Sequence, residues 1–238
     1  MANLCIIPAR GGSKRIPRKN IKDFLGKPVI AYSIQAAISS HLFDEIMVST
    51  DDEEIAELAL KLNAKVPYKR SDENSGDFAT TADVIYEVLK YYENIGMTFD
   101  YVCCIYPCAP FVNKTVLNTA YSKLKDGNFD TVFPLVEYQT PIQRAFKFNN
   151  DETSFYFSEF ENTRSQDLER AYYDAGQFYW LNTITFLSNK KILTNNTSSI
   201  ILSSFQSQDI DNLSDWNIAE LKYLNFNQEN NKNGDSLL

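Results

Sequence analysis

Short apolar runs alternate with amphipathic segments through the first 136 residues of this 238-residue chain. The runs have the length of buried strands, and the segments repeat apolar residues at helical spacing, as Ile55, Leu58 and Leu62 do. This alternation predicts an α/β fold with a Rossmann-like, mostly parallel sheet and helices on both faces. The predicted strands are 4–8, 45–49, 101–106 and 131–136, and the predicted helices are 29–39, 53–63, 82–94 and 114–126.

The pattern changes after residue 136. Residues 137–170 are irregular and polar, with aromatics at alternate positions such as Phe146 and Phe148, which predicts a strand pair or extended arm. Exposed aromatics on an arm favour contact with a second subunit, so we expect a homodimer. Strands at 177–181 and 200–204 and a helix at 214–224 should complete a single domain over 1–225, followed by a tail, 226–238, whose Asn-rich composition favours fraying.

Composition excludes several classes of protein. Hydrophobic residues make up 44% of the chain, but no apolar run approaches the roughly 20 residues of a membrane helix. The first residues lack the basic start of a signal peptide, so we expect a cytoplasmic protein. A net charge of −8 disfavours nucleic-acid binding. The four cysteines lack zinc-site spacing and indicate reduced thiols, and His41 is the sole histidine, which disfavours Ser-His-Asp or Cys-His chemistry.

Positive charge gathers instead in one place, directly after the first strand. This basic loop, residues 8–20, combines Gly11 and Gly12 with the cations Arg10, Lys14 and Lys19. Paired glycines let backbone N–H groups approach a phosphate, and the cations and a serine hydroxyl at position 13 add donors. The loop matches neither the P-loop nor the dinucleotide fingerprint. It predicts triphosphate binding, with a solvated turn as the alternative.

A second signal is the acidic segment, Asp209-Ile210-Asp211. Side chains two apart on an extended chain project to one face, so the two carboxylates can share a hard cation. Mg²⁺ between carboxylates and phosphates serves nucleotidyl transfer. An Asp-x-Asp pair can equally be structural, but the strand at 200–204 could deliver it to the sheet edge that carries the basic loop.

With these segments in place, the chain resembles the cytidylyltransferases that activate acidic sugars, the CMP-sialic acid synthetase family, over essentially its whole length. Within the family it looks most like the branch that uses pseudaminic acid, on residues 106–111, 164–168 and 173–180. The segments that carry the family resemblance are Ile7-Pro8-Ala9-Arg10-Gly11-Gly12-Ser13-Lys14 with Pro17, Lys19 and Asn20, then Val48-Ser49-Thr50-Asp51, Arg70, Tyr106-Pro107-Cys108-Ala109-Pro110 and Asp209-Ile210-Asp211.

The resemblance implies roles for individual residues. Arg10, Lys19 and Asp211 would be catalytic, and Asp209 and Asp211 would hold Mg²⁺. The residues implied to bind CTP are Arg10, Gly11, Gly12, Ser13, Lys14, Lys19, Asn20, Arg70, Thr80, Tyr106 and Pro107. Those implied to bind the sugar are Tyr106, Arg164, Tyr173, Gln177 and Tyr179.

The implied reaction is attack of the anomeric hydroxyl of an acidic nine-carbon sugar on the α-phosphate of CTP, with release of pyrophosphate. Enzymes for sialic acid carry Arg-Pro-Asn-Gly where this chain has residues 173–176, so the sugar carboxylate needs another partner, for which Arg164 or Arg170 is available. Pseudaminic acid is the expected substrate, which would place the product in flagellin glycosylation. Sialic, legionaminic and ketodeoxyoctonic acid remain alternatives, as does a non-catalytic nucleotide sensor.

Overall fold

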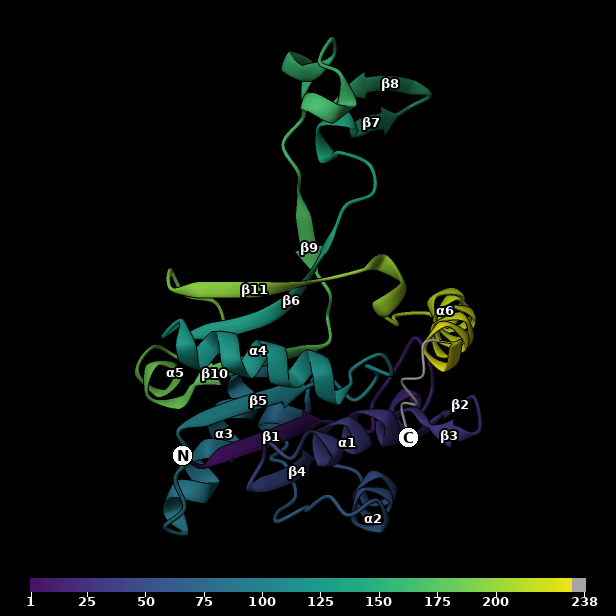
Figure 1. Cartoon of the computed structure of the whole chain (residues 1–238). Helices are drawn as coiled ribbons and strands as arrows, with labels where there is room; N and C mark the ends of the chain where they lie inside the picture. The colour runs from purple at the N-terminus through teal and green to yellow at the C-terminus, as the bar shows by residue number, and fades with distance from the viewer. Residues whose placement is uncertain (233–238) are drawn as a thin grey trace.

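The computed structural model describes the backbone of residues 1–232 and the side chains of residues 1–226 (Figure 1). The strands are β1 (Asn3–Pro8), β2 (Asp23–Phe24), β3 (Lys27–Pro28), β4 (Glu45–Ser49), β5 (Tyr101–Ile105), β6 (Thr131–Glu137), β7 (Phe146–Asn149), β8 (Glu152–Phe155), β9 (Tyr172–Asp174), β10 (Phe178–Asn182) and β11 (Thr197–Leu202). The helices are α1 (Val29–Ser40), α2 (Glu53–Lys61), α3 (Thr81–Asn94), α4 (Lys114–Asp126), α5 (Thr183–Asn189) and α6 (Leu213–Lys232).

A mixed sheet forms the centre of the fold, in the order β11-β6-β10-β5-β1-β4, with β9 paired to β6. β1 runs parallel to β4 and β5, and β11 runs parallel to β6. β10 is antiparallel to both of its neighbours. The predicted α/β class and mostly parallel sheet are therefore confirmed, with β10 and β9 as the antiparallel strands.

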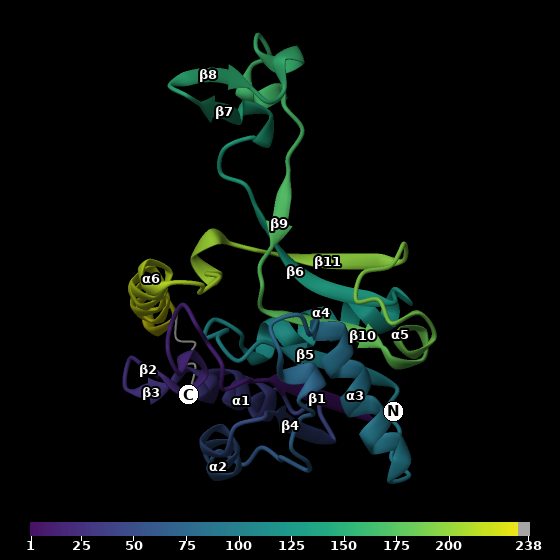
Figure 2. The same cartoon turned by 180° about the vertical axis from the view of Figure 1, so that it is seen from behind.

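Alternation along the strands divides the core into two layers. Leu4 and Ile6 point to one face of the sheet, where α3 and α5 pack, while Cys5 and Ile7 point to the other face, beneath α1 and α4. Figures 1 and 2 show these helix pairs in front of and behind the sheet. Coverage on both faces explains why the central strand β1 is apolar from Leu4 to Pro8.

Polar side chains fix where the helices begin. Asp52 caps α2 by accepting a hydrogen bond from the Ile55 N–H at 3.0 Å. Thr80 and Asp83 form a reciprocal capping box at the start of α3, and Asn113 caps α4. Each cap pairs backbone donors that the first turn leaves unsatisfied.

A third apolar cluster attaches the C-terminal helix to the small β2–β3 hairpin that follows the basic loop. Trp216 on α6 meets Phe24 edge to face, with ring centroids 5.5 Å apart, and Phe24 meets Tyr32 in the same way. Buried aromatic pairs of this geometry add stability beyond their buried area. The chain that leads into α6 is therefore anchored beside the basic loop.

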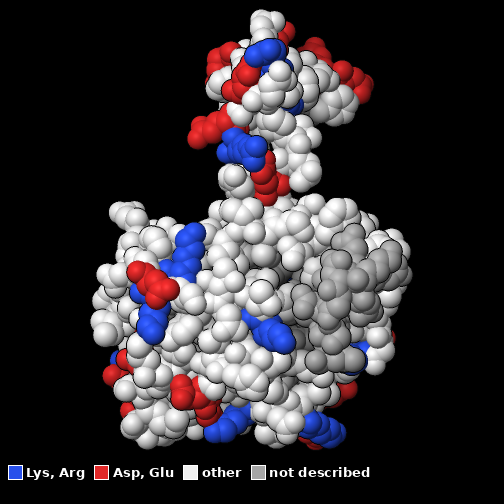
Figure 3. Space-filling model, viewed as in Figure 1, with Lys and Arg blue, Asp and Glu red and all other residues white. Residues whose placement is uncertain are grey.

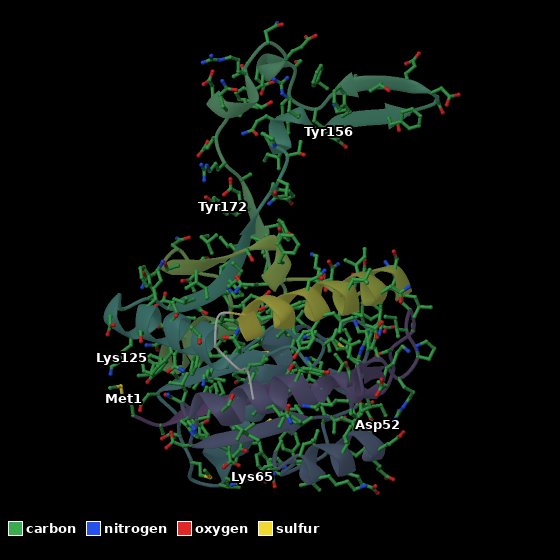
Figure 4. The ribbon with its side chains drawn as sticks, turned by 45° about the vertical axis from the view of Figure 1, so that its right-hand side comes forward. Met1, Asp52, Lys65, Lys125, Tyr156 and Tyr172 are labelled. Carbon is green, nitrogen blue, oxygen red and sulfur yellow. The ribbon has the colours of Figure 1, made fainter. Side chains whose placement is uncertain are left out.

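Residues 138–171, here called the arm, leave the body at the end of β6 and return at β9. Its tip holds the β7–β8 hairpin, which gives the predicted strand pair, and Figure 4 shows Tyr156 at this tip and Tyr172 on the stem. Phe146, Phe148 and Tyr156 each expose half or more of their surface. The arm also carries both acidic and basic side chains on the face seen in Figure 3.

Two parts of the fold differ from the sequence expectation. The tail expected to fray over 226–238 is helical through Lys232, because α6 continues past residue 224; residues 233–238 lie outside the described residues. Helix α5 was not predicted, since its seven residues follow β10 without a break. Within residues 1–232, each helix is too short or too polar to cross a membrane.

Candidate active site

A cavity of about 590 Å³ opens where β1 and β5 end at their carboxyl edges, the place where open α/β sheets bind ligands. It brings together the basic loop, the start of the loop after β5 and the acidic segment, which are far apart in the sequence. The lining residues are Pro8, Arg10, Ser13, Lys14, Arg15, Ile16, Lys19, Asn20, Asp77, Tyr106, Pro107, Cys108, Gly176, Asp209, Ile210 and Asp211.

The two glycines of the basic loop have different surroundings. The Gly11 N–H donates to Asp51 Oδ1 at 3.0 Å, and a Cβ on Gly11 would lie 2.6 Å from Asp52 Oδ2. Gly12 has no atom within 4 Å of such a Cβ. The Gly11 N–H is therefore already paired within the protein, and the prediction that this backbone binds phosphate is best supported at Gly12. Position 11 needs a glycine because Asp52 occupies the space that a Cβ would fill.

Arg18 holds Asp52 in that place. Its guanidinium contacts the Asp52 carboxylate through both terminal nitrogens and also reaches Glu54. The hydrogen bond from Arg18 is the main cause that lowers the pKa of Asp52. Arg18 itself has a left-handed backbone, with φ of 56°, which turns the chain toward this contact. The start of the basic loop is thus fixed from the α2 side.

Four cations of the basic loop line the cavity, and each already has a partner in the protein; that of Arg15 belongs to the acidic segment described below. Arg10 Nη1 lies 3.0 Å from Asp77 Oδ1, and the Lys14 ammonium contacts the other oxygen of Asp77. The Lys19 ammonium donates instead to the Ile210 carbonyl at 2.7 Å. Lys14, then Arg10, lower the pKa of Asp77, whose position 63 residues after Lys14 gave no motif to find it by. Asp77 is a cavity residue that sequence reasoning missed.

Asn20 shapes the other end of the loop. Its Nδ2 donates to the Arg10 carbonyl at 2.8 Å, and its Oδ1 accepts from the Cys108 thiol at 3.3 Å. Burial raises the pKa of Cys108 to about 12, so the thiol stays protonated and can donate. This agrees with a packing thiol rather than a nucleophile.

The acidic segment faces these cations. Asp209 and Asp211 both line the cavity, and Asp211 Oδ1 lies 2.8 Å from Arg15 Nη2. Desolvation, followed by the charge of Asp211, raises the pKa of Asp209. Two carboxylates that repel each other in one cavity form a donor set suited to a hard divalent cation.

A cation there would need ligands beyond these two. Among the side chains of residues 1–226, no group of three or more His, Cys, Asp and Glu could hold a metal. Gly176, with φ of 63°, lies against Asp209: a Cβ there would be 3.7 Å from the Asp209 Cγ. The two carboxylates therefore fit an ion whose remaining ligands come from substrate and water, as at many Mg²⁺ sites.

Tyr106, directly after β5, also lines the cavity. Its hydroxyl lies 3.1 Å from Thr81 Oγ1, and its ring meets the Tyr179 ring edge to face, with centroids 5.7 Å apart. Burial raises the pKa of Tyr106. Pro107, next in the chain, also lines the cavity.

Two residues expected around cytosine do not line the cavity. Arg70 is buried, with 4% of its surface exposed, and its Nε donates to Ser49 Oγ at 2.9 Å. Burial is the main cause that lowers its pKa. The Thr80 hydroxyl is engaged in the capping box of α3.

Four residues expected to bind the sugar also lie elsewhere. Tyr179 is buried beneath Tyr106 and donates to Asp174, while Gln177 is 98% buried. Tyr173 packs on Tyr138 at the base of the arm. Arg164 lies on the arm, where its Nε pairs with Asp167 at 2.7 Å. In a single chain, only Tyr106 of the predicted sugar residues lines the cavity.

An α/β sheet whose carboxyl edge joins a cationic glycine loop to a carboxylate pair defines a nucleotidyltransferase-type protein. The sequence model of the cytidylyltransferase family matches residues 4–223, and the chain belongs to that family. It is 45% identical over 224 residues to the pseudaminic acid cytidylyltransferase of Campylobacter jejuni strain 81-176, covering 94% of this chain and 97% of that one.

More distant relatives extend the comparison. The chain is 30% identical to the CMP-N,N'-diacetyllegionaminic acid synthase of Legionella pneumophila, over 96% of this chain and 99% of that one. The solved structure of a CMP:2-keto-3-deoxy-manno-octonic acid synthetase complexed with CTP matches with a TM-score of 0.68 at 16% identity, over 94% of this chain and 98% of that one. That likeness establishes the shared fold.

Proposed function

We propose that this protein activates pseudaminic acid by transferring CMP from CTP to the anomeric hydroxyl of the sugar, with release of pyrophosphate. The observation that carries the proposal is the meeting of the basic loop and the acidic segment in one cavity of about 590 Å³. Family membership supports CTP as the donor, and the 45% identity to a pseudaminic acid enzyme supports the sugar.

In this proposal the basic loop binds the triphosphate. Arg10, Lys14 and Lys19 supply charge, and Ser13 and the open backbone at Gly12 supply uncharged donors. Arg10 and Lys14 must exchange Asp77 for phosphate oxygens when the nucleotide enters. Arg10 and Lys19 then stabilise the charge that develops on the departing pyrophosphate.

In this proposal the acidic segment and Tyr106 position the attacking hydroxyl. Asp209 and Asp211 would hold Mg²⁺, which supplies charge neutralisation at the phosphates and acidifies a coordinated hydroxyl. Tyr106 lines the cavity and would position the sugar. A new bond forms between the anomeric oxygen and the α-phosphorus, the bond to pyrophosphate breaks, and the hydroxyl proton leaves to solvent.

We propose further that the chain is a single domain whose arm joins two copies in a homodimer. The exposed aromatics at the arm tip support a protein partner there. Arg164 can serve a sugar site only if the arm of one copy reaches the cavity of another, because Arg164 does not line the cavity of its own chain. The four free thiols fit a reducing compartment, the cytoplasm.

Pyrophosphate release in the presence of CTP and Mg²⁺ tests the reaction, with pseudaminic, legionaminic and sialic acids offered in parallel. We expect release with pseudaminic acid at a kcat/KM well above that of the other two. Release confined to sialic or legionaminic acid would keep the reaction and overturn the substrate. Nucleotide binding without release with any acidic sugar would instead indicate a sensor.

A further inference from the structure

The segment that carries the two cavity carboxylates has little regular structure of its own. Between β11 and α6 the chain makes one 3₁₀ turn, Ser204–Gln206, and then runs irregularly to residue 212. Four of its carbonyl groups, those of Ser204, Gln206, Ser207 and Ile210, nevertheless accept hydrogen bonds from side chains of other elements. Such pairing determines where the carboxylates lie relative to the basic loop.

Gln177, just before β10, is one of these donors. Its Nε2 donates to the Gln206 carbonyl at 2.6 Å, and next to this bond the Ser207 hydroxyl donates to the Ala175 carbonyl at 3.2 Å. The Gln177 Oε1 is buried and has no hydrogen-bond partner among the described residues. A leucine would avoid that desolvated oxygen, so stability alone does not explain an amide here.

Lys222 on α6 is the second donor. Its ammonium donates to the carbonyls of Ser204 and Ser207, each at 2.9 Å, which places it across the 3₁₀ turn. Partial burial lowers the pKa of Lys222, and in the part of the chain that the structure describes no carboxylate forms an ion pair with it. A half-buried lysine whose acceptors are all backbone carbonyls stabilises one conformation of the backbone that carries them.

We propose that Gln177 and Lys222 are positioning residues for the acidic segment. Neither lines the cavity, but both hold the backbone within a few residues of Asp209. Lys19 completes the attachment from the opposite side through the Ile210 carbonyl. The inference rests on the proposed function for its kinetic consequence, and replaces the sugar-binding role expected for Gln177.

Two variants test the proposal, Lys222→Met and Gln177→Leu, with Lys125→Met on the exposed face of α4 as the matched control. Hydrogen exchange of the amides in 204–212 should quicken by about fivefold in each test variant, as expected for one lost hydrogen bond. The Mg²⁺ concentration for half-maximal pyrophosphate release should rise about tenfold, the usual effect of losing support behind a metal ligand. KM for CTP at saturating Mg²⁺ should stay within about twofold of wild type.

Lys222→Arg retains donors and should restore both readouts to near the wild-type values. Exchange rates and Mg²⁺ dependence equal to those of Lys125→Met would overturn the proposal. So would a loss of activity that only follows a lower Tm, because that pattern marks a purely structural role. Hydrogen exchange needs no turnover, so a wild-type protein inactive with every sugar would refute the proposed function while leaving the positioning role open to this measurement.

Discussion

The Lys19 ammonium donates to the Ile210 carbonyl at 2.7 Å, and this bond joins the basic loop to the residue between Asp209 and Asp211. The two bonded residues are 191 positions apart, and together with the Arg15–Asp211 ion pair this hydrogen bond ties the cation side of the cavity to the anion side. A substitution at Lys19 therefore acts on both sides at once.

Lys19→Met should raise KM for CTP and lower kcat together, with kcat/KM falling by about 100-fold or more. The substitution removes a phosphate contact and also the hydrogen bond to the Ile210 carbonyl that holds the acidic segment. Steady-state kinetics with CTP as the varied substrate measure the effect, and Lys69→Met, an exposed lysine outside the cavity, serves as the control. Unchanged constants for Lys19→Met would remove Lys19 from the phosphate site.

Asp211→Ala should lower turnover by about three orders of magnitude while leaving Tm close to wild type. Among the described residues, Asp211 forms an ion pair with Arg15 alone, and an exposed pair of that kind contributes little, about 0–1 kcal/mol. Pyrophosphate release and a thermal melt, with Asp126→Ala on α4 beside them, separate the two effects. A variant that turns over at near-normal rate would exclude Asp211 as a metal ligand.

The two glycines of the basic loop should respond differently to alanine. Gly11→Ala places a methyl 2.6 Å from Asp52 Oδ2 and should destabilise the fold by about 1–3 kcal/mol, the usual range for overpacking. Gly12→Ala meets no protein atom, so Tm should hold while KM for CTP rises about tenfold. Equal KM values for wild type and Gly12→Ala would show that phosphate does not approach this backbone.

Asp209→Asn should stabilise the protein at neutral pH while it abolishes activity. Because the pKa of Asp209 is raised in the folded state, protonation favours folding, and the ionised group lowers the free energy of unfolding at higher pH. The gain in Tm, on the order of 1–2 °C, should shrink as the pH falls through the titration of Asp209. Thermal melts of both proteins from pH 4 to 8 measure it, and a Tm below wild type at pH 7 would contradict the expectation.

Phe148→Glu should convert the proposed dimer to a monomer. Phe148 exposes 69% of its surface at the arm tip, and a charge there would be desolvated against a partner. Light scattering after gel filtration gives the mass. Phe78→Glu, a change at a phenylalanine that is 98% exposed on the body, should leave the mass of the dimer unchanged. A monomeric wild type, or a dimer that survives Phe148→Glu, would count against the arm.

The sheet could be predicted because the sequence alternates regularly between short apolar runs and segments with helical spacing of apolar residues. Helix α4 and strand β4 have the predicted bounds: capping residues mark both ends of α4, and a short apolar run marks β4. The direction of β10 was not predictable, because a five-residue apolar run looks the same whether the strand is parallel or antiparallel to its neighbours. In the structure β10 follows the arm and runs antiparallel to β5. Helix α6 runs on to Lys232, past its predicted end at 224, while its aromatic packing on Phe24 and Tyr32 lies within the predicted part.

The lining of the cavity also contains residues that the sequence identified and residues that it did not. Residues of the basic loop and the acidic segment were found because each concentrates one kind of chemistry within a few positions. Asp77 and Arg15 were missed, since an isolated charge carries no pattern until the fold brings a partner to it. Gln177 was expected at the sugar, but in a single chain its side chain contacts the Gln206 carbonyl instead of lining the cavity; a sequence does not show which way a side chain turns.

The arm leaves and re-enters the sheet at adjacent points, with Glu137 paired to Tyr172 and the Tyr138 N–H donating to the Ala171 carbonyl at 2.9 Å. A tight turn could bridge these positions without disturbing the strands beneath. The arm can therefore change in length and surface without altering the sheet. Related chains could acquire new assemblies in this way while the nucleotide cavity keeps its residues.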